Sequence, residues 1–543
     1  MRVAPRTGVT RLRSLVSSLG LVGGAPGPSA AQRASSTYRL AASCVVGIIA
    51  LAVVGAVMGP RWDPEPLAEP LDPDDPDTDV TGAPELSTYE VVTSVVPVQL
   101  DGVRVRARIL EPVGAPGPVP GVVFVHGAGT GRHSEAFVDQ ARRLAARGIA
   151  TIVPDKRLDT YSTRHRDYVA MAGDYARSLA VLRARRGVDP ARVGVYGESE
   201  GGWIAPVMAC ADPPPAFVVL ASSPVVTPRA QAAFATDQYL RNTGVPRGVF
   251  RAIPRAVALS LPGGGLDYAD FDVQPYQQQM GQPVFVAYGT GDASMPTVQG
   301  AQQILADATV ADNAGVTVRY YAGADHGLRV RQTVSARFVD DLAGWVLGLP
   351  GTAGAAPRVA GDRPVQPYRA DPPPRARWLR DGDTVLRILG GAAGLIALAF
   401  TAVAVDRGVR SVVARGWNGR GAPPPTPGPR WAPGIGPHLV GLGFGAIATV
   451  AALIGYLVTV ARIAMNYRRN ALVVQGGWLA VRLGGLSVVL AGVLLARRML
   501  DVRAAGGVVS PGALRMAATW GVCGGSAVLA VMLAYWGVFQ LGI

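Results

Sequence analysis

The stretch VDPARVGVYGESEGGWIAPVMA, residues 188–209, decides the fold of the largest part of this chain. Its first half ends in a short apolar run, which is typical of a buried strand, and its second half has a helical pattern. The two halves are joined by Gly197-Glu198-Ser199-Glu200-Gly201, a G-x-S-x-G sequence. A turn this sharp crowds the neighbours of the serine, so glycine is required two residues to either side and the hydroxyl is exposed. The context predicts a reactive serine, Ser199, on an elbow that Gly197 and Gly201 make possible.

Strand-like and helix-like patterns alternate across residues 88–348, on both sides of this elbow. The region begins with a predicted hairpin whose turn is Asp101-Gly102, a pair that suits tight two-residue turns. Short, unbroken apolar runs come next, as expected for parallel strands that are buried on both faces. These runs lie at 121–125, 149–153, 192–196, 216–221, 283–288 and 316–321, with predicted helices at 133–147 and 164–186 between some of them. We therefore expect an α/β fold with a doubly wound, mostly parallel sheet.

A serine hydroxyl is a weak nucleophile at neutral pH and needs a neighbouring base that a carboxylate orients. His326 follows the last apolar run, in YYAGADHGL, and Asp292 follows the run before it. Because the reactive groups of such a sheet lie at the carboxyl ends of its strands, we expect Ser199, Asp292 and His326 to meet there. Asp325 is the alternative acid, although an immediate neighbour of His326 is poorly placed to reach its ring. Asp155, in PDKR, is expected to be structural.

The first of the predicted parallel strands ends in the glycine-rich turn His126-Gly127-Ala128-Gly129. A tetrahedral intermediate of acyl transfer carries an oxyanion, which needs preorganised N–H donors. We expect the backbone N–H groups of Ala128 and Glu200 to be these donors, the second at a helix N-terminus whose dipole adds to the effect. His126, Gly127 and Gly129 are expected to shape the loop.

Five motifs occur in order between residues 126 and 327: HGAG, PDKR, VDPARVGVYGESEGG, YGTGD and GADHG. With them, residues 88–348 resemble the α/β-hydrolase superfamily, specifically its esterase, serine aminopeptidase and dienelactone hydrolase-like members. The resemblance implies hydrolysis through an acyl-serine intermediate, carried by Ser199, Asp292 and His326. We expect no metal and no other cofactor. Glu198 departs from the family, in which histidine is more usual at this position, and the departure leaves the preferred acyl group open.

Residues 40–59 form an uncharged apolar stretch, long enough for a helix to cross about 30 Å of hydrocarbon. Six arginines precede it, so the positive-inside rule keeps the N-terminus in the cytoplasm and exports the chain after residue 59. A cleaved signal peptide is the alternative, but the apolar run exceeds the roughly 7–15 residues of a signal core. We expect a multi-pass protein of the cell membrane with an extracytoplasmic hydrolase domain. Four further candidate spans lie at 386–405, 437–461, 472–496 and 517–541.

The net charge of +14 is concentrated beside these apolar segments, with 13 arginines against 2 acidic residues in 406–543. This placement suits loops next to lipid and excludes nucleic acid as the expected partner. The short loop between the candidate spans 437–461 and 472–496 is predicted to lie outside the cytoplasm. It departs from the positive-inside rule because it contains Arg462, Arg468 and Arg469. Arg482 falls inside the fourth span, where snorkelling to the membrane surface or bonding to carbonyls is favoured over a transport role because these helices contain no carboxylate.

The segments between the domains have a different composition. Residues 1–39 are predicted to be a disordered cytoplasmic tail. Residues 60–87 and 349–385 are predicted to be Pro-rich linkers, extended and poorly packed, so that the hydrolase domain is expected to act without the helices. Residues 224–281 interrupt the sheet pattern and are predicted to form a small cap that sets specificity.

The leading functional hypothesis is a membrane-anchored serine hydrolase that cleaves carboxylic esters or related acyl compounds. Its expected partners are a small-molecule or lipid acyl substrate and the membrane lipid around it. One alternative is a serine aminopeptidase-like peptidase, in which Glu200 meets the substrate amine, and another is an envelope acyltransferase, in which an alcohol replaces water. An alternative of another class is a catalytically inert membrane transport or signalling protein, because a fold alone never establishes activity.

Overall fold

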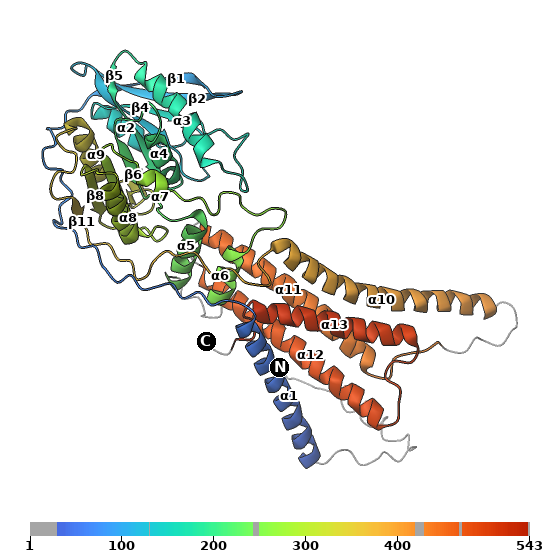
Figure 1. The fold of residues 1–543 in the computed structure, drawn as a ribbon. Helices are drawn as coiled ribbons and strands as arrows, with labels where there is room; N and C mark the ends of the chain where they lie inside the picture. Colours follow the sequence, from blue (N-terminus) through green and yellow to red (C-terminus); the bar gives the residue numbers. More distant parts are fainter. Residues whose placement is uncertain (1–29, 130, 243–248, 419–427, 466–469, 541–543) are drawn as a thin grey trace, which may run out of the picture.

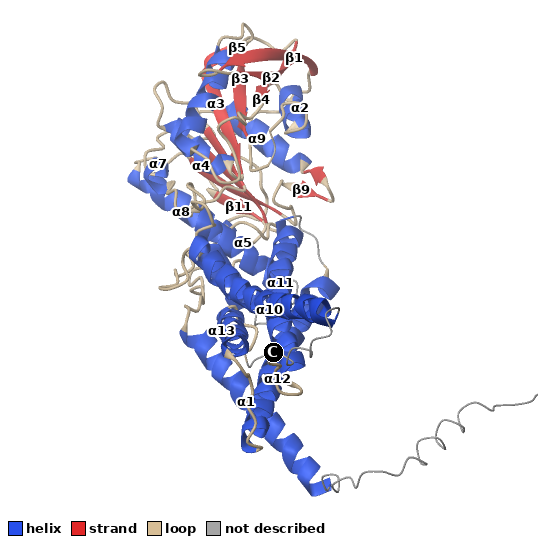
Figure 2. Cartoon of the chain, turned by 90° about the vertical axis from the view of Figure 1, so that its right-hand side faces the viewer, coloured by secondary structure: helices blue, strands red, loops and turns tan. Residues whose placement is uncertain are grey.

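The computed structural model describes residues 30–129, 131–242, 249–418, 428–465 and 470–540. Strands gather in one part of the molecule and long helices in the other (Figure 2). The first helix, α1 (Ala30–Val57), begins within the predicted tail, whose residues 1–29 lie outside the described part of the chain.

A nine-stranded sheet forms the first part, in the order β1-β2-β4-β3-β5-β6-β7-β8-β11. Its first strand pairs antiparallel with the second and the second with the fourth, and the remaining neighbours are parallel. The predicted α/β class and mostly parallel sheet are confirmed. The strands are β1 (Glu90–Gln99), β2 (Arg104–Val113), β3 (Val119–Val125), β4 (Ala150–Pro154), β5 (Val188–Glu198), β6 (Val218–Ala221), β7 (Val284–Gly289), β8 (Val316–Tyr321) and β11 (Val359–Gly361), with a separate small hairpin of β9 (Arg329–Val330) and β10 (Thr333–Val334).

The predicted hairpin turn joins β1 to β2. Gly102 takes a positive φ of +72°, which glycine adopts without strain, and the Leu100 N–H donates to the carbonyl of Val103 at 2.9 Å.

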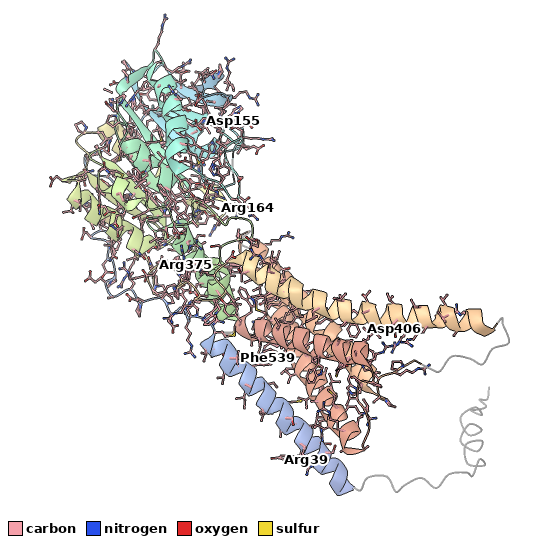
Figure 3. The ribbon with its side chains drawn as sticks, turned by 45° about the vertical axis from the view of Figure 1, so that its right-hand side comes forward. Arg39, Asp155, Arg164, Arg375, Asp406 and Phe539 are labelled. Atoms are coloured by element: carbon pink, nitrogen blue, oxygen red, sulfur yellow. The ribbon has the colours of Figure 1, made fainter. Side chains whose placement is uncertain are left out.

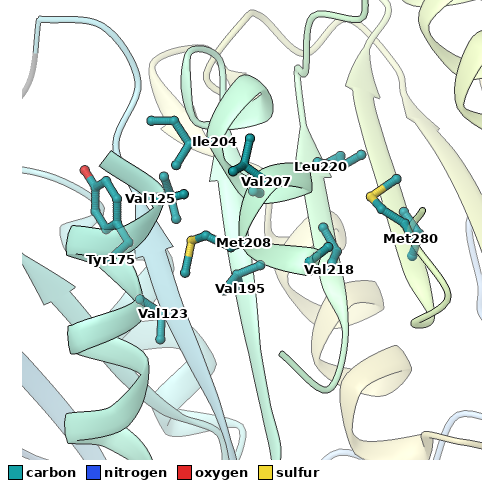
Figure 4. Close-up of a cluster of buried hydrophobic side chains, with 14 of the residues drawn as sticks. Val123, Val125, Tyr175, Val195, Ile204, Val207, Met208, Val218, Leu220 and Met280 are labelled. Atoms are coloured by element: carbon teal, nitrogen blue, oxygen red, sulfur yellow. The ribbon is translucent and has the colours of Figure 1, made fainter. Parts of the chain in front are cut away.

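Helices cover both faces of this sheet. On one face pack α3 (Tyr168–Arg183), α4 (Gly201–Ala209) and α8 (Thr297–Val310), and on the other α2 (Val138–Ala146) and α9 (Ala336–Gly348). Successive residues of β3 alternate between the two cores, as the strand repeat requires. Figure 4 shows Val123, Val195 and Val218 of three neighbouring strands beside Met208 of α4.

Both predicted helices are shorter than expected at their N-terminal ends. In α2 the delay follows Phe137, whose positive φ of +51° is not helical. In α3 the carboxylate of Asp167 accepts hydrogen bonds from the N–H groups of Val169 and Ala170, which caps the helix there.

The segment predicted as a cap lies between β6 and β7. Its helices are α5 (Pro228–Asn242), α6 (Val249–Ala258) and α7 (Gln274–Gln277). The first two lie between the sheet and the long helices of the second part (Figure 1).

Five helices of the described residues are long and apolar enough to cross a membrane, by length and composition alone. Each contains one of the five predicted spans or most of it. After α1 they are α10 (Gly382–Asn418), α11 (Ile435–Met465), a π-helical turn (Leu472–Gly476) that continues into α12 (Gly477–Ala504), and α13 (Ala513–Tyr535).

The five helices alternate in direction, so that one end of each lies toward the sheet domain (Figure 1). At the far ends, Arg497 donates to the carbonyl of Ser36 at 2.9 Å, and Arg515 pairs with Asp406 at 2.8 Å. Figure 3 shows Arg39 and Asp406 away from the sheet domain, whereas Phe539 lies near it. Of the arginines in the predicted outer loop, Arg468 and Arg469 lie outside the described residues.

The arginine inside the fourth span is bonded to main chain. Arg482 Nη2 donates to the carbonyl of Gln540 at 2.9 Å, and the amide of Gln540 donates to the carbonyl of Ala52 at 3.1 Å. Carbonyl partners satisfy this half-buried cation in the helix bundle, in agreement with the structural interpretation of Arg482.

The two Pro-rich segments differ from the expectation of poor packing. The Asp74 N–H donates to the carbonyl of Val359, and the Gly361 N–H donates to that of Asp75, while β11 of the second segment pairs with β8. Proline prevents a continuous ladder, but the remaining N–H groups still form isolated bonds. Arg319, which is buried, adds hydrogen bonds to the carbonyls of Thr78 and Asp79. Both segments therefore belong to the folded sheet domain.

Candidate active site

The reactive elbow has the predicted strand, turn and helix. Ser199 follows β5 with a positive φ of +56°, a strained value for a residue with a side chain. A Cβ at Gly197 would collide with the carbonyl oxygen of Gly201, and one at Gly201 would lie 2.6 Å from the carbonyl oxygen of Val125. Both glycines are required because the backbone turns back on itself here.

The structure brings Ser199, His326 and Asp292 together. His326 Nε2 lies 2.9 Å from Ser199 Oγ, and His326 Nδ1 lies 2.9 Å from Asp292 Oδ2. Because a carboxylate only accepts, these partners assign the ring proton to Nδ1 and leave Nε2 to accept from the hydroxyl. The side chain of Asp292 has no exposed surface, and its second oxygen accepts from the N–H groups of Ser294 and Met295. The acid is therefore held in one orientation toward the ring.

The alternative acid is turned to other partners. Asp325 Oδ1 accepts from the N–H groups of Gly327 and Arg329, at 2.9 and 3.0 Å. It closes the turn that carries His326, as expected for a sequence neighbour.

Two opposing effects set the protonation of His326. Burial lowers its pKa, but the charge and hydrogen bond of Asp292, with smaller contributions from Glu198 and Asp325, raise the pKa above the usual value of histidine.

The glycine-rich loop lies directly against the elbow. A Cβ at Gly127 would lie 3.2 Å from Ser199 Cβ, and Gly129 has a positive φ of +86°. Within the described residues, no hydrogen bond engages the backbone N–H of Ala128 or of Glu200. Glu200 also stands at the N-terminus of α4, where the helix dipole favours negative charge.

The histidine of this loop is buried and does not reach the serine. His126 Nε2 lies 2.5 Å from the carbonyl oxygen of Pro154, and the backbone N–H of His126 donates to the hydroxyl of Tyr175. Burial lowers the pKa of His126 to about 4, so the ring is neutral at pH 7.

A buried ion cluster beneath the loop was not predicted from the sequence. The carboxylate of Glu200 is bonded to Lys156 at 2.8 Å and to Arg166 at 2.5 Å, and it accepts from the hydroxyl of Tyr161 at 3.0 Å. Lys156 also donates to the carbonyl of Gly127 at 2.8 Å, which ties the cluster to the loop. The only lysine of the chain, three residues after the apolar run at 149–153, was the available signal.

Glu198, on the other side of the serine, has a different environment. Its carboxylate accepts a 2.8 Å hydrogen bond from the hydroxyl of Tyr196. Burial raises the pKa of Glu198, while that hydrogen bond and the charge of His326 lower it by less.

Asp155 has the structural role that was expected. Its carboxylate accepts from the backbone N–H of His133 at 2.7 Å and lies 2.6 Å from the ring Nδ1. In the described part of the chain, no group of three or more His, Cys, Asp or Glu side chains is arranged to hold a metal ion.

Comparisons with known proteins found a family model and solved structures that are similar to parts of this chain. A family model described as serine aminopeptidase, S33, matches residues 117–250. A Pyrobaculum calidifontis esterase is 16% identical, with a TM-score of 0.36 and coverage of 63% of this chain and 98% of that one. Est1E from Butyrivibrio proteoclasticus is 16% identical, with a TM-score of 0.32 and coverage of 46% and 95%. A comparison with curated proteins found no match.

The sheet order, the strand-turn-helix elbow and the matched segment agree with one another. The sheet domain has the α/β-hydrolase fold, and residues 117–250 within it match the serine aminopeptidase, S33, family model.

Proposed function

We propose that this chain is a membrane-anchored serine hydrolase that cleaves carboxylic esters or related acyl compounds. The observation that carries the proposal is the pair of 2.9 Å contacts linking Ser199 Oγ to His326 and His326 to Asp292. A hydroxyl, an imidazole and a buried carboxylate in this order are what nucleophilic acyl transfer requires.

In the first half of the reaction, Ser199 Oγ attacks the carbonyl carbon of the substrate while His326 Nε2 takes the hydroxyl proton. The carbonyl oxygen becomes an oxyanion, which accepts from the N–H groups of Ala128 and Glu200. Asp292 stays ionised and stabilises the imidazolium. His326 then gives its proton to the leaving oxygen as the carbon–oxygen bond breaks, leaving an acyl group on Ser199.

In the second half, water enters from the side of the departed alcohol. His326 takes a proton from the water, whose oxygen attacks the acyl carbon. A second oxyanion forms between the same two N–H donors. When it collapses, the bond to Ser199 breaks and the serine oxygen recovers the proton from His326.

The position of the active-site edge of the sheet supports the proposal that the substrate comes from the membrane surface. Ser199, Asp292 and His326 all follow the carboxyl ends of parallel strands, and so does the cap, which extends from this edge to the long helices (Figure 1). We infer that an acyl lipid at that surface would approach the serine along the cap. We therefore favour lipid or other membrane-associated acyl compounds over freely soluble ones.

We also propose that the hydrolase domain lies outside the cytoplasm. The helix ends away from this domain are rich in arginine, including Arg407, Arg410, Arg497 and Arg498, as cytoplasmic ends are expected to be. Protease added to intact spheroplasts should digest the domain. Protection in intact spheroplasts with digestion only after lysis would reverse the topology.

A peptidase remains the second candidate, because the family model matched at residues 117–250 is named for a serine aminopeptidase. The ion pairs of Glu200 count against the expected amine-binding role of its carboxylate. Lys156 and Arg166 already neutralise it, so a substrate ammonium would have to displace a buried cation. Aminoacyl amides, acyl esters and alcohol acceptors assayed in parallel would separate peptidase, esterase and acyltransferase.

The decisive test is covalent labelling of the full-length protein in detergent with a fluorophosphonate probe. Wild type should be labelled at Ser199 and should hydrolyse p-nitrophenyl butyrate, and Ser199→Ala should do neither. A folded wild-type protein that takes up no probe and hydrolyses no acyl compound would support the inert membrane protein instead.

A further inference from the structure

One arginine of the cap is bonded to the ends of two membrane-span candidates. Arg255, on α6, is only 3% exposed. Its guanidinium donates to the carbonyls of Gly55, Gly59 and Pro60 at 2.9 to 3.3 Å, and to that of Tyr535. The Tyr535 ring also lies 4.6 Å beneath the guanidinium carbon. A single cap residue thus joins the last turns of α1 and α13.

The chemistry of helix ends explains why arginine suits this position. The last four carbonyls of a helix have no partner within it, and the helix dipole makes that end negative. At the edge of a membrane, where water is scarce, such carbonyls need another donor. A guanidinium has five N–H donors in a rigid plane and remains charged, so one side chain can serve several carbonyls.

Two glycines make room for this contact. A Cβ at Gly59 would lie 2.7 Å from Arg255 Cζ and 2.8 Å from a ring carbon of Tyr535. A Cβ at Gly55 would collide with the main chain of Ala534, so glycine also allows α1 and α13 to approach closely. The contact is therefore built from both the cap and the helices.

Apolar packing joins the same elements. The buried Leu240 of α5 and Ala252 of α6 belong to the core cluster of the long helices and not to either core of the sheet. Tyr239 packs against the same cluster. The middle of the cap is thus part of the helix bundle.

The other side of the cap reaches the catalytic acid. The Gln231 amide on α5 donates to the carbonyl of Ser294, whose own N–H donates to Asp292 Oδ1 at 2.8 Å. Arg229 of α5 donates to the carbonyl of Val257 at 3.0 Å, which ties α5 to the end of α6. Short contacts therefore extend from the catalytic acid through both cap helices to the bundle.

We propose that Arg255 is a positioning residue through which α1 and α13 hold the cap at the active-site edge, so that the membrane helices determine how the acyl substrate is bound. The proposal rests on the proposed hydrolase function. Arg255 touches no reacting atom. Its loss should loosen the cap and weaken substrate binding while leaving the serine, histidine and aspartate in place.

The test compares three variants of the full-length protein in lipid nanodiscs. Arg255→Met removes the donors, Arg255→Lys keeps the charge without the planar fork, and Arg241→Met is the matched control. Arg241 is a cap arginine that pairs with Asp237 on its own helix and lies 4.9 Å from the centre of the Tyr368 ring. The measurements are hydrogen exchange of residues 228–258, the rate of fluorophosphonate labelling, and kcat and KM for p-nitrophenyl butyrate and p-nitrophenyl palmitate.

For Arg255→Met we expect faster exchange in α5 and α6 with unchanged exchange in β3 and β5. We expect KM for the long-chain ester to rise about tenfold at a kcat within about twofold of wild type, since such a split reports lost binding. The short-chain ester and the labelling rate should change little. Arg255→Lys should lie between the wild type and Arg255→Met, and it serves for the same comparison if Arg255→Met does not accumulate.

Equal exchange and equal KM in the Arg255 variants and Arg241→Met would overturn the proposal. Labelling of all the proteins in that case would leave the hydrolase function standing. If the wild type itself is not labelled, the hydrolase function fails, and the exchange of α5 and α6 alone then decides whether Arg255 holds the cap.

Discussion

Two glutamates flank Ser199, and their surroundings have little in common. Glu198 ends a strand, accepts from one tyrosine and lies close enough to His326 to influence its pKa. Glu200 begins a helix and is buried between Lys156 and Arg166. The elbow reverses the chain between them, so the two carboxylates meet different partners. Under the proposed mechanism, Glu198 should therefore affect proton transfer, and Glu200 should affect stability.

The largest effect is expected from replacing Ser199, the residue between the two glutamates. Ser199→Ala should lower kcat for p-nitrophenyl butyrate by about 10³-fold or more, because no covalent intermediate can form. The substitution removes only a hydroxyl group and should leave the fold unchanged. The circular dichroism spectrum of the variant should therefore match that of the wild type. Turnover near the wild-type rate in the purified variant would show that another residue is the nucleophile.

Next in size are changes at the base and at its acid. His326→Ala should cost about as much as Ser199→Ala, since the two act as one unit, whereas Asp292→Asn should cost less in kcat. The measurement is kcat for the same ester at a pH where wild type is fully active. Asp325→Asn is the matched control, and a larger loss there than for Asp292→Asn would move the acid to the alternative residue.

Glu200→Gln tests how much the ion cluster of Glu200, Lys156 and Arg166 contributes to stability. The change leaves the buried Lys156 and the half-buried Arg166 without their counter-ion, so the variant should lose about 3–5 kcal/mol of stability. Thermal unfolding in detergent, with Glu198→Gln as the matched control, measures the difference. Equal melting temperatures for the two variants would mean that the buried cluster contributes little.

The smallest effect is expected from Glu198→Gln, and it concerns pH. His326 must be neutral to accept the serine proton, and its raised pKa keeps it protonated to higher pH, so activity falls on the acid side. The charge of Glu198 contributes to that rise. Glu198→Gln should therefore move the acid limb of kcat/KM toward lower pH, with kcat at the optimum within about twofold of wild type. An unchanged limb, or a shift toward higher pH, would contradict the role given to Glu198.

Whether a residue of the candidate site could be predicted from the sequence depends on how far away in the sequence its partners lie. The elbow at Ser199, the loop at Ala128 and the order of serine, acid and histidine could be predicted, because each depends on its own strand end. Glu200 was predicted for its backbone N–H and, in the peptidase alternative, for contact with a substrate amine, but not as part of a buried ion cluster. Its side chain contacts Lys156 and Arg166, which lie 44 and 34 residues away in the sequence. No local sequence pattern predicts ion pairs between residues so far apart.

The packing of the Pro-rich segments also depends on partners that are far away in the sequence. Their composition predicted extended chain, and residues 60–87 and 349–385 do contain little regular structure. Composition could not predict that Asp74 and Asp75 would pair with the strand β11, because that pairing joins segments nearly 300 residues apart.

By itself, the sequence determined the local units of this protein: a strand, a strained serine turn and a helix, repeated β and α patterns, and five apolar segments. These follow from side-chain period, glycine sterics and hydropathy, which act between near neighbours. Only the tertiary structure decided which charges meet beneath the oxyanion loop and that Arg255 joins the cap to α1 and α13. Such contacts depend on where distant segments come to lie, because a buried ion or a helix end takes whichever donor or acceptor the fold places beside it.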